Sequence, residues 1–430
     1  MKRIRILHLI DPAGPLVGPG AVAMLADLAA SSAARRVDLL ALILGGSGAE
    51  NLARDLGVNS HDRAPAYGGR PWLGVSAVRR YLAAIGPVDL LHCWSPATLA
   101  LATLVAPATP RLLTLAANPI ATSQGQWLRL LAAQSQAPLA MLPASNCIKR
   151  AWAEAGVDPA IMHVLRPGLD LTRLQTDQRA SLRREWGVRS NDTTVIAIMT
   201  QHGPCVDATR AAHVLANAAL SGLDVVLVAP AEAARRAAAR TIACGSQAPD
   251  RLVFESRLAR PWEVLPGCDV ALVLGDDTRS GEAEAPSGRA ATQPLARAAA
   301  ALGALLGRPR QPRPGQVHGV LPMLWAAAAG KIIIAEAGYA VAEIVENGKT
   351  ALVVKPGDNG AIVQRLREVI ADPHRAWSLR DTARSEAYSF FSCSRFAEGA
   401  VAVYEQILAG GEIAVPELPL TGGLAFAGRT

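Results

Sequence analysis

Short apolar runs that end in turn residues recur through residues 1–170 and alternate with Ala-rich stretches of helical periodicity. These runs show no polar alternation, which is typical of strands that crossover helices bury on both faces. They span Ile4–Ile10, Val37–Leu44, Val88–His92, Leu112–Leu115, Leu139–Leu142 and Met162–Leu165. The pattern predicts a doubly wound parallel sheet.

A second series of the same kind begins after Thr193. Its runs span Thr194–Met199, Asp224–Val228, Leu252–Phe254, Val270–Leu274, Lys331–Ala335 and Ala351–Val354. A polar segment, Leu174–Asn191, separates the two series and carries a predicted short helix over Arg179–Trp186. We therefore expect an α/β protein with two Rossmann-like, doubly wound parallel-sheet domains that face each other across a cleft. Ligands of such sheets bind at the carboxyl ends of the strands.

The domain boundaries follow from this alternation. We predict an N-terminal domain over 1–173, a linker over 174–192, a C-terminal domain over 193–375, helices over 376–409 that cross back to the N-terminal domain, and a tail over 410–430. Residues 276–316 are rich in Ala, Gly, Pro and Arg and interrupt the second series, so they are predicted to be an insertion.

Composition supports packed cores, because 50% of the 430 residues are apolar and only 18% are charged. The first apolar run ends at Asp11 and Pro12, which indicates a buried strand rather than a signal peptide. The sequence has no apolar run long enough to span a membrane. The cysteines lie singly, without the spacing of a metal, redox or disulfide motif. These features predict a reduced, cytoplasmic protein without a bound metal or cofactor.

The formal net charge of +7 lies mostly in residues 1–180. Basic doublets there include Arg35-Arg36, Arg79-Arg80 and Lys149-Arg150. They are interpreted either as a solvated surface or as a peripheral contact with the inner face of a membrane or with a phosphorylated acceptor. Nucleic-acid binding is not expected, because aromatic residues are few and do not interleave with the basic ones.

One stretch, Ala342–Asp358, reads AEIVENGKTALVVKPGD. It resembles the segment that closes the donor site in the family 4 (group 1) retaining glycosyltransferases, which use nucleotide-sugars and have the GT-B fold. Further likenesses are Leu142–Asn146, Gly156-Val157, Arg166–Asp170, Asp372-Pro373 and the predicted helix Phe391–Leu408 with Tyr404. The resemblance covers nearly all of residues 1–409 apart from the insertion.

This resemblance implies a donor site in the second domain and an acceptor site in the first. It implies transfer of a sugar from a UDP- or GDP-linked donor to a saccharide or lipid-linked acceptor, with retention of the anomeric configuration. The departing diphosphate then needs positive charge. In the family an Arg and a Lys after the second domain's first strand supply it, and these positions fall on Gln201 and Val206.

The family also uses two glutamates eight positions apart, and these positions fall on Val317 and Trp325. Neither side chain accepts a hydrogen bond as a carboxylate does. Glu282 or Glu284 of the insertion is an alternative for the first glutamate. Because charged hydrogen bonds contribute about 1.5–3 kcal/mol each, we expect a weakened donor site.

The remaining donor-binding candidates are His202, His318, Gly338 and Glu343, together with Gln201. The histidines could restore part of the lost charge or be ordinary polar surface residues. The Gly338 amide could meet a phosphate, and Glu343 could instead cap the helix that follows Gly338.

The loop after the first strand carries Gly18 and Gly20, which resemble the family's glycine-rich loop. Alternatively, the loop is a tight strand-to-helix turn that needs glycine for its conformation only.

Two functions are consistent with these residues. The first is a glycosyltransferase with an altered donor site. The second is a catalytically inactive GT-B protein that acts as a binding or scaffold partner. The sequence contains no nucleophile elbow and no phosphate loop with its lysine that would indicate other chemistry.

Overall fold

A computed structural model describes residues 3–11, 24–26, 28–29, 31–44, 60–64, 71–116, 119, 122–174, 176–199, 208–231, 236–246, 249–274, 320–411 and 413–415. These residues form two compact units. The first contains the described residues up to Gly168 and those from Cys393 onward, and the second contains those between Leu169 and Ser392. No helix in these ranges is both long enough and apolar enough to cross a membrane.

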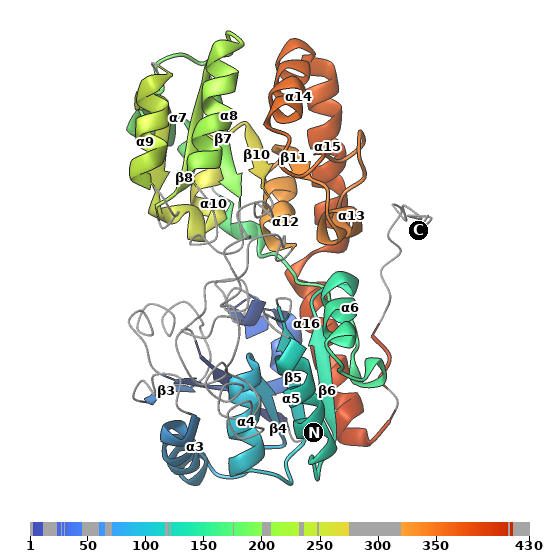
Figure 1. The fold of residues 1–430 in the computed structure, drawn as a ribbon. Helices are drawn as coiled ribbons and strands as arrows, with labels where there is room; N and C mark the ends of the chain where they lie inside the picture. Colours follow the sequence, from blue (N-terminus) through green and yellow to red (C-terminus); the bar gives the residue numbers. More distant parts are fainter. Residues whose placement is uncertain are drawn as a thin grey trace. The chain divides into compact units, whose positions relative to one another are not determined.

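The first unit is built on a parallel sheet of six strands in the order β3-β2-β1-β4-β5-β6. The strands are β1 (Ile4–Ile10), β2 (Val37–Leu44), β3 (Ser60–Ala64), β4 (Leu90–Cys93), β5 (Arg111–Leu115) and β6 (Leu139–Pro143). The helices include α3 (Pro71–Ile85), α4 (Pro96–Val105), α5 (Thr122–Ala133), α6 (Asn146–Glu154) and, from the end of the chain, α16 (Cys393–Ala409) (Figure 1). Short crossovers and local caps such as Ser95, which accepts from the Thr98 amide at the start of α4, set the helices onto the sheet.

The second unit repeats this architecture with the strand order β12-β11-β10-β7-β8-β9, again all parallel. Its strands are β7 (Thr194–Met199), β8 (Val225–Pro230), β9 (Leu252–Glu255), β10 (Val270–Val273), β11 (Ile332–Glu336) and β12 (Leu352–Val354). Its helices include α7 (Arg179–Glu185), α8 (Ala208–Leu220), α9 (Arg236–Gly245), α10 (Pro261–Val264), α12 (Leu321–Ala328), α13 (Tyr339–Ile344), α14 (Asn359–Ala371) and α15 (Pro373–Phe390). The predicted fold class of two doubly wound α/β sheets is confirmed.

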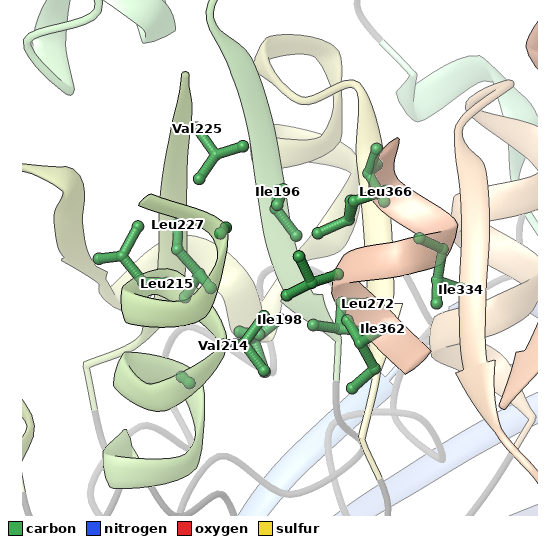
Figure 2. Packing of buried hydrophobic residues seen from close by; sticks show 14 of the residues in the cluster. Ile196, Ile198, Val214, Leu215, Val225, Leu227, Leu272, Ile334, Ile362 and Leu366 are labelled. Carbon is green, nitrogen blue, oxygen red and sulfur yellow. The ribbon is translucent and has the colours of Figure 1, made fainter. Parts of the chain in front are cut away.

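The core of the second unit explains why its strands are apolar along their whole length. Alternate residues of each strand, such as Ile196 and Ile198 on β7, face helices α8 and α14, which contribute Val214 and Ile362 (Figure 2). The side chains between them on the strands are buried as well, including Val195. Burial on both faces removes the need for polar alternation, as the sequence pattern indicated.

One predicted strand does not form, and one strand of the structure was not predicted. The run Met162–Leu165 is not a strand, because it makes a single bridge, between Met162 and Met141. Strand β3, Ser60–Ala64, was not predicted, since its sequence SHDRA has no apolar run. It pairs with β2 at the edge of the sheet, where backbone pairing on one side holds a polar strand.

The segment for which the sequence predicts a linker, 174–192, packs on the second unit. Arg183 of α7 is buried and donates to the Thr193 carbonyl oxygen at 2.5 Å. Trp186, also buried, donates from Nε1 to Glu255 at 3.2 Å. Helix α15 belongs to this unit too, while α16 belongs to the first.

Helix α16 is fixed to the first sheet through a buried histidine pair. On β1 and β4 the leucines Leu7 and Leu91 face the cluster formed with α3–α6, so the intervening His8 and His92 point to the opposite face. There the Nδ1 atom of His92 lies 2.8 Å from the Tyr404 hydroxyl of α16. The first sheet therefore bonds directly to α16.

Both imidazoles are held in the neutral state. His92 Nε2 lies 2.8 Å from the Thr114 hydroxyl, so each of its ring nitrogens has a hydroxyl partner that can donate or accept. His8 Nδ1 accepts a hydrogen bond of 3.0 Å from Trp94 Nε1, so its hydrogen lies on Nε2, which has no partner among the described residues. Burial lowers the pKa of His8 to about 3 and the pKa of His92 well below its ordinary value, while it raises the pKa of Tyr404.

We predict that His8 makes the protein acid-labile. Because the unfolded chain takes up this proton near pH 6.5 and the folded chain only near pH 3, the His8 contribution to stability is lost as the pH falls through that window. The loss is ~1.4 kcal/mol for each pH unit. Substituting His8→Gln keeps an acceptor for Trp94 and should make the free energy of unfolding, measured by urea denaturation at pH 6.5 to 4.5, less dependent on pH by that amount.

The matched control is His374→Gln, which changes an exposed histidine of α15 and should leave the slope as it is. If the wild type and His8→Gln lose stability in parallel between these pH values, the buried neutral His8 is not the source of the acid lability.

Candidate functional site

The strand order of the second sheet reverses between β7 and β10. From β7 the chain adds β8 and β9 on one side, and it then returns to add β10, β11 and β12 on the other. Ligands of doubly wound sheets bind beside such a switch point, at the carboxyl ends of the strands. The residues that follow β7 (200–207) and β10 (275–319) lie outside the described residues. So do the predicted site residues Gln201, His202, Val206, Val317, His318, Gly18 and Gly20, and the insertion with Glu282 and Glu284.

A buried ion pair lies at this carboxyl edge. Glu336, the last residue of β11, is fully buried, and Arg210, in the first turn of α8, is 8% exposed. The Arg210 guanidinium forms two hydrogen bonds with the carboxylate, one from Nη1 to Oε2 at 2.8 Å and one from Nη2 to Oε1. The same Oε1 accepts a 2.7 Å bond from the Gly357 amide. The pair therefore connects α8, β11 and the turn after β12.

Both partners occupy positions where the local pattern is apolar. Glu336 continues the strand face of Ile332 and Ile334, which pack into the core. Arg210 lies on the helix among Ala208, Ala211 and Val214, all of them buried. A charge in an apolar layer is retained only when a partner satisfies it, so the two residues require each other.

Sequence reasoning did not select this pair. The available signal was a glutamate that ends the apolar run of β11 together with an arginine inside the Ala-rich stretch of α8. Neither residue matches a motif, and only the tertiary structure brings them together across 126 positions of chain.

Trp325 is the one of the four aligned family positions that the described residues include. It lies on α12, is 3% exposed, and its ring centroid is 5.0 Å from that of Trp262 on α10. The planes of the two rings are tilted by 48°, and the guanidinium carbon of Arg173 lies 5.2 Å from the Trp262 ring centroid. The tryptophan thus contributes to packing within the second unit.

Gly338 and Glu343 both belong to the segment that follows β11. Gly338 is the N-cap residue of α13, with φ −173° and ψ 163°, and its carbonyl oxygen accepts the Ala342 amide at 2.9 Å. Glu343 is near the carboxyl end of this six-residue helix, so it does not cap the helix start, which has no side-chain cap. The alternative role of Glu343 as an N-cap is therefore wrong.

Glu343 instead lines a pocket in the second unit formed by α12, α13 and α15. Apolar side chains make up most of the wall, including Leu324, Ile344 and Phe390. Glu346 and Glu386 also line it, and Lys349 bonds to both of their carboxylates, at 2.9 and 3.5 Å. The acidic groups are thereby partly neutralised at the pocket.

Within the described ranges no group of three or more His, Cys, Asp or Glu side chains is arranged to hold a metal ion.

We predict that the Arg210–Glu336 pair is required for the stability of the second unit. Replacing Arg210→Met leaves a buried carboxylate without its cation, which should cost ~3–5 kcal/mol of the free energy of unfolding. The double variant Arg210→Met/Glu336→Leu removes both charges and should regain most of this loss in urea denaturation. If the single and double variants are equally unstable, the pair is not coupled as its geometry indicates.

A matched control is Arg240→Met on α9, because this arginine lies with its guanidinium carbon 5.4 Å from the Phe254 ring centroid and is exposed. Its replacement should change the free energy of unfolding by less than ~1 kcal/mol.

One segment of the second unit matches the model of a known protein family. Residues 321–389, which run from α12 to α15, match the family model of "Glycosyl transferases group 1". None of the curated proteins compared with the chain matches it significantly.

Similar solved structures cover nearly the whole chain. Anabaena HepE in complex with UDP and glucose is 17% identical, covers 92% of this chain and 98% of its own, and has a TM-score of 0.66. A glycosyltransferase from Rickettsia africae is 13% identical over 95% of this chain and 99% of its own, with a TM-score of 0.67. A sucrose-phosphate synthase from Thermosynechococcus elongatus is 15% identical over 95% and 100%, with a TM-score of 0.65. The chain has the GT-B fold, and its residues 321–389 carry the group 1 glycosyl transferase pattern.

Proposed function

We propose that this protein is a group 1 glycosyltransferase that binds a nucleotide-sugar at the carboxyl edge of its second sheet. The observation that carries the proposal is where the family match falls. Residues 321–389 supply β11, α13, β12 and the turn with Gly357, which frame this edge around the buried ion pair. The same position beside the strand switch point is where doubly wound sheets bind nucleotides.

A UDP-linked donor is the first choice for this site. Anabaena HepE, which shares the fold, is described with UDP and glucose, and also with UDP-glucose. The finer assignments of family 4, retention of configuration and a saccharide or lipid-linked acceptor on the first unit rest on the sequence resemblance. Peripheral contact with an anionic membrane is part of the same proposal and is supported by Arg79 and Arg80, which are exposed on α3.

The proposed donor site has an electrostatic weakness. The positions that carry an Arg and a Lys in the family are Gln201 and Val206, which lie outside the described residues. Helix α8 follows these positions in the sequence. Its first cation is Arg210, and the Glu336 carboxylate neutralises it. The diphosphate must therefore be held largely by backbone amides and by whatever charge His202 and His318 supply, which predicts weak binding and slow transfer.

We predict that UDP stabilises the protein measurably and that restored cations strengthen its binding. Each charge-assisted hydrogen bond is worth about 1.5–3 kcal/mol, so Gln201→Arg/Val206→Lys should lower the dissociation constant for UDP at least ~10-fold. Thermal-shift and calorimetric titrations measure both effects, because a ligand that binds only the folded state raises stability.

A matched control adds the same two charges elsewhere. Asn217→Lys/Gln364→Arg changes exposed residues of α8 and α14 and should leave UDP binding unchanged. An equal gain in both double variants would contradict placement of the diphosphate beside residues 201 and 206. If the wild type shows no stabilisation even at millimolar UDP or UDP-glucose, the donor-binding proposal fails and the scaffold function is favoured.

A further inference from the structure

Cationic side chains gather at the opposite, amino edge of the second sheet. Here Cys268 and Asp269 precede β10, and Gly330 and Lys331 precede β11. The two strands are neighbours in the sheet, so these residue pairs lie side by side. Helices α7 and α15 contribute arginines that contact this edge.

The first group of contacts joins α7 and β11 to the residues before β10. Lys331 donates from Nζ to the Cys268 carbonyl oxygen at 3.0 Å, and Arg179 donates from Nη1 to the same oxygen at 3.4 Å. Arg179 also bonds from Nη2 to the Asp269 carboxylate at 2.6 Å. The other oxygen of that carboxylate accepts from Arg183 Nη1 at 2.9 Å. Two cations thus share one carbonyl, and two share one carboxylate.

Helix α15 adds two arginines one turn apart. Arg380 donates from Nε to the Gly330 carbonyl oxygen at 2.8 Å. The Cδ atom of Arg384 lies 3.5 Å from the position that a Cβ atom on Gly330 would occupy. Both side chains therefore pass over the residue that precedes Lys331, and both residues are exposed. The guanidinium carbon of Arg384 lies 5.4 Å from the Tyr388 ring centroid.

The charges of this cluster do not balance. In the contacts described, Arg179 and Arg183 share one carboxylate, that of Asp269, while Lys331 and Arg380 donate to backbone carbonyl groups and Arg384 packs beside Gly330. The other acceptors are neutral carbonyl groups. Burial lowers the pKa of Lys331 to about 8, and the charges of Arg179 and Arg380 lower it as well, while Cys268 and Asp269 act in the opposite direction. The cations around Lys331 repel one another, and a bound anion would reduce this repulsion.

We propose that the amino edge of the second sheet binds a phosphate group of charge near −2, clamped between Arg179, Arg380 and Arg384 above Lys331. A guanidinium presents five N–H donors in a planar fork that suits phosphate oxygens, and Arg380 uses only its Nε in the contact with Gly330. Arg179 remains 46% exposed in spite of its bonds, so its outer edge is accessible. The site is separate from the proposed donor site, which lies at the other end of the same strands.

The test uses inorganic phosphate and pyrophosphate as probes, titrated into the full chain at constant ionic strength set with chloride. The wild type should gain thermal stability with phosphate beyond that seen with chloride. The variant Arg380→Gln/Arg384→Gln should weaken the response at least ~10-fold, because it removes two charge-assisted contacts. Arg367→Gln on α14, an exposed arginine outside the cluster, is the control and should respond as the wild type does.

A second variant keeps the test decisive if Arg380→Gln loosens the contact with Gly330. Arg384→Gln alone removes a side chain whose contacts are with the Gly330 position and the Tyr388 ring, and it should still weaken the phosphate response. Phosphate binding that is equal in the wild type and in these variants, or no phosphate-specific stabilisation at all, overturns the proposal.

The phosphate group could be that of a small molecule or of a lipid headgroup, and vesicles separate the two. Co-sedimentation with phosphatidylglycerol vesicles, compared with phosphatidylcholine vesicles, should be weaker for Arg380→Gln/Arg384→Gln than for the wild type if the ligand is a headgroup. A phosphate response that depends on these arginines, with equal co-sedimentation of the variant and the wild type, assigns the site to a free phosphate compound. Saturation with UDP should not displace the probe, because the donor site is at the opposite edge.

Discussion

The buried bond between Arg210 and Glu336 is the constraint around which the second unit is arranged at its ligand-binding edge. At the carboxyl end of an apolar parallel sheet, the polar groups need hydrogen-bond partners once helices cover both faces of the sheet. Here one carboxylate receives two N–H groups from α8 and one from the turn after β12. The start of α8, the end of β11 and the Gly357 turn are fixed to each other by this single group, and the proposed nucleotide site is built from the same three segments.

The two edges of this sheet differ in their balance of charge, although the chain supplies cations to both. At the carboxyl edge, Arg210 is matched by Glu336, and the sequence resemblance places Gln201 and Val206 where group 1 glycosyltransferases carry two cations. At the amino edge, several cations converge on Asp269 and on neutral carbonyls. Since a phosphate binds where positive charge is unmatched, the proposed phosphate site lies at an edge that the usual nucleotide site does not use.

Much of the fold could be predicted because its strands are buried on both faces. Runs such as Ile4–Ile10 and Thr194–Met199 coincide with strands, since continuous apolar sequence leaves few other structures. Ser60–Ala64 could not be found in this way, because an edge strand is held by backbone pairing and its sequence is polar. Met162–Leu165 has the right composition but only one bridging partner. Of the candidate site, Gly338 and Glu343 could be selected by resemblance, whereas the Arg210–Glu336 pair depends on contacts between distant segments that no local pattern encodes.

We infer above all that a nucleotide-sugar occupies the carboxyl edge of the second sheet. Hydrogen exchange followed by mass spectrometry, with and without saturating UDP-glucose, tests this placement, because bound ligand protects the amides it contacts. We expect slower exchange at residues 200–210, 336–343 and 355–358, and unchanged exchange at 176–183 and 330–331. Protection confined to the amino edge, or none at either edge in ligand-saturated protein, would contradict it.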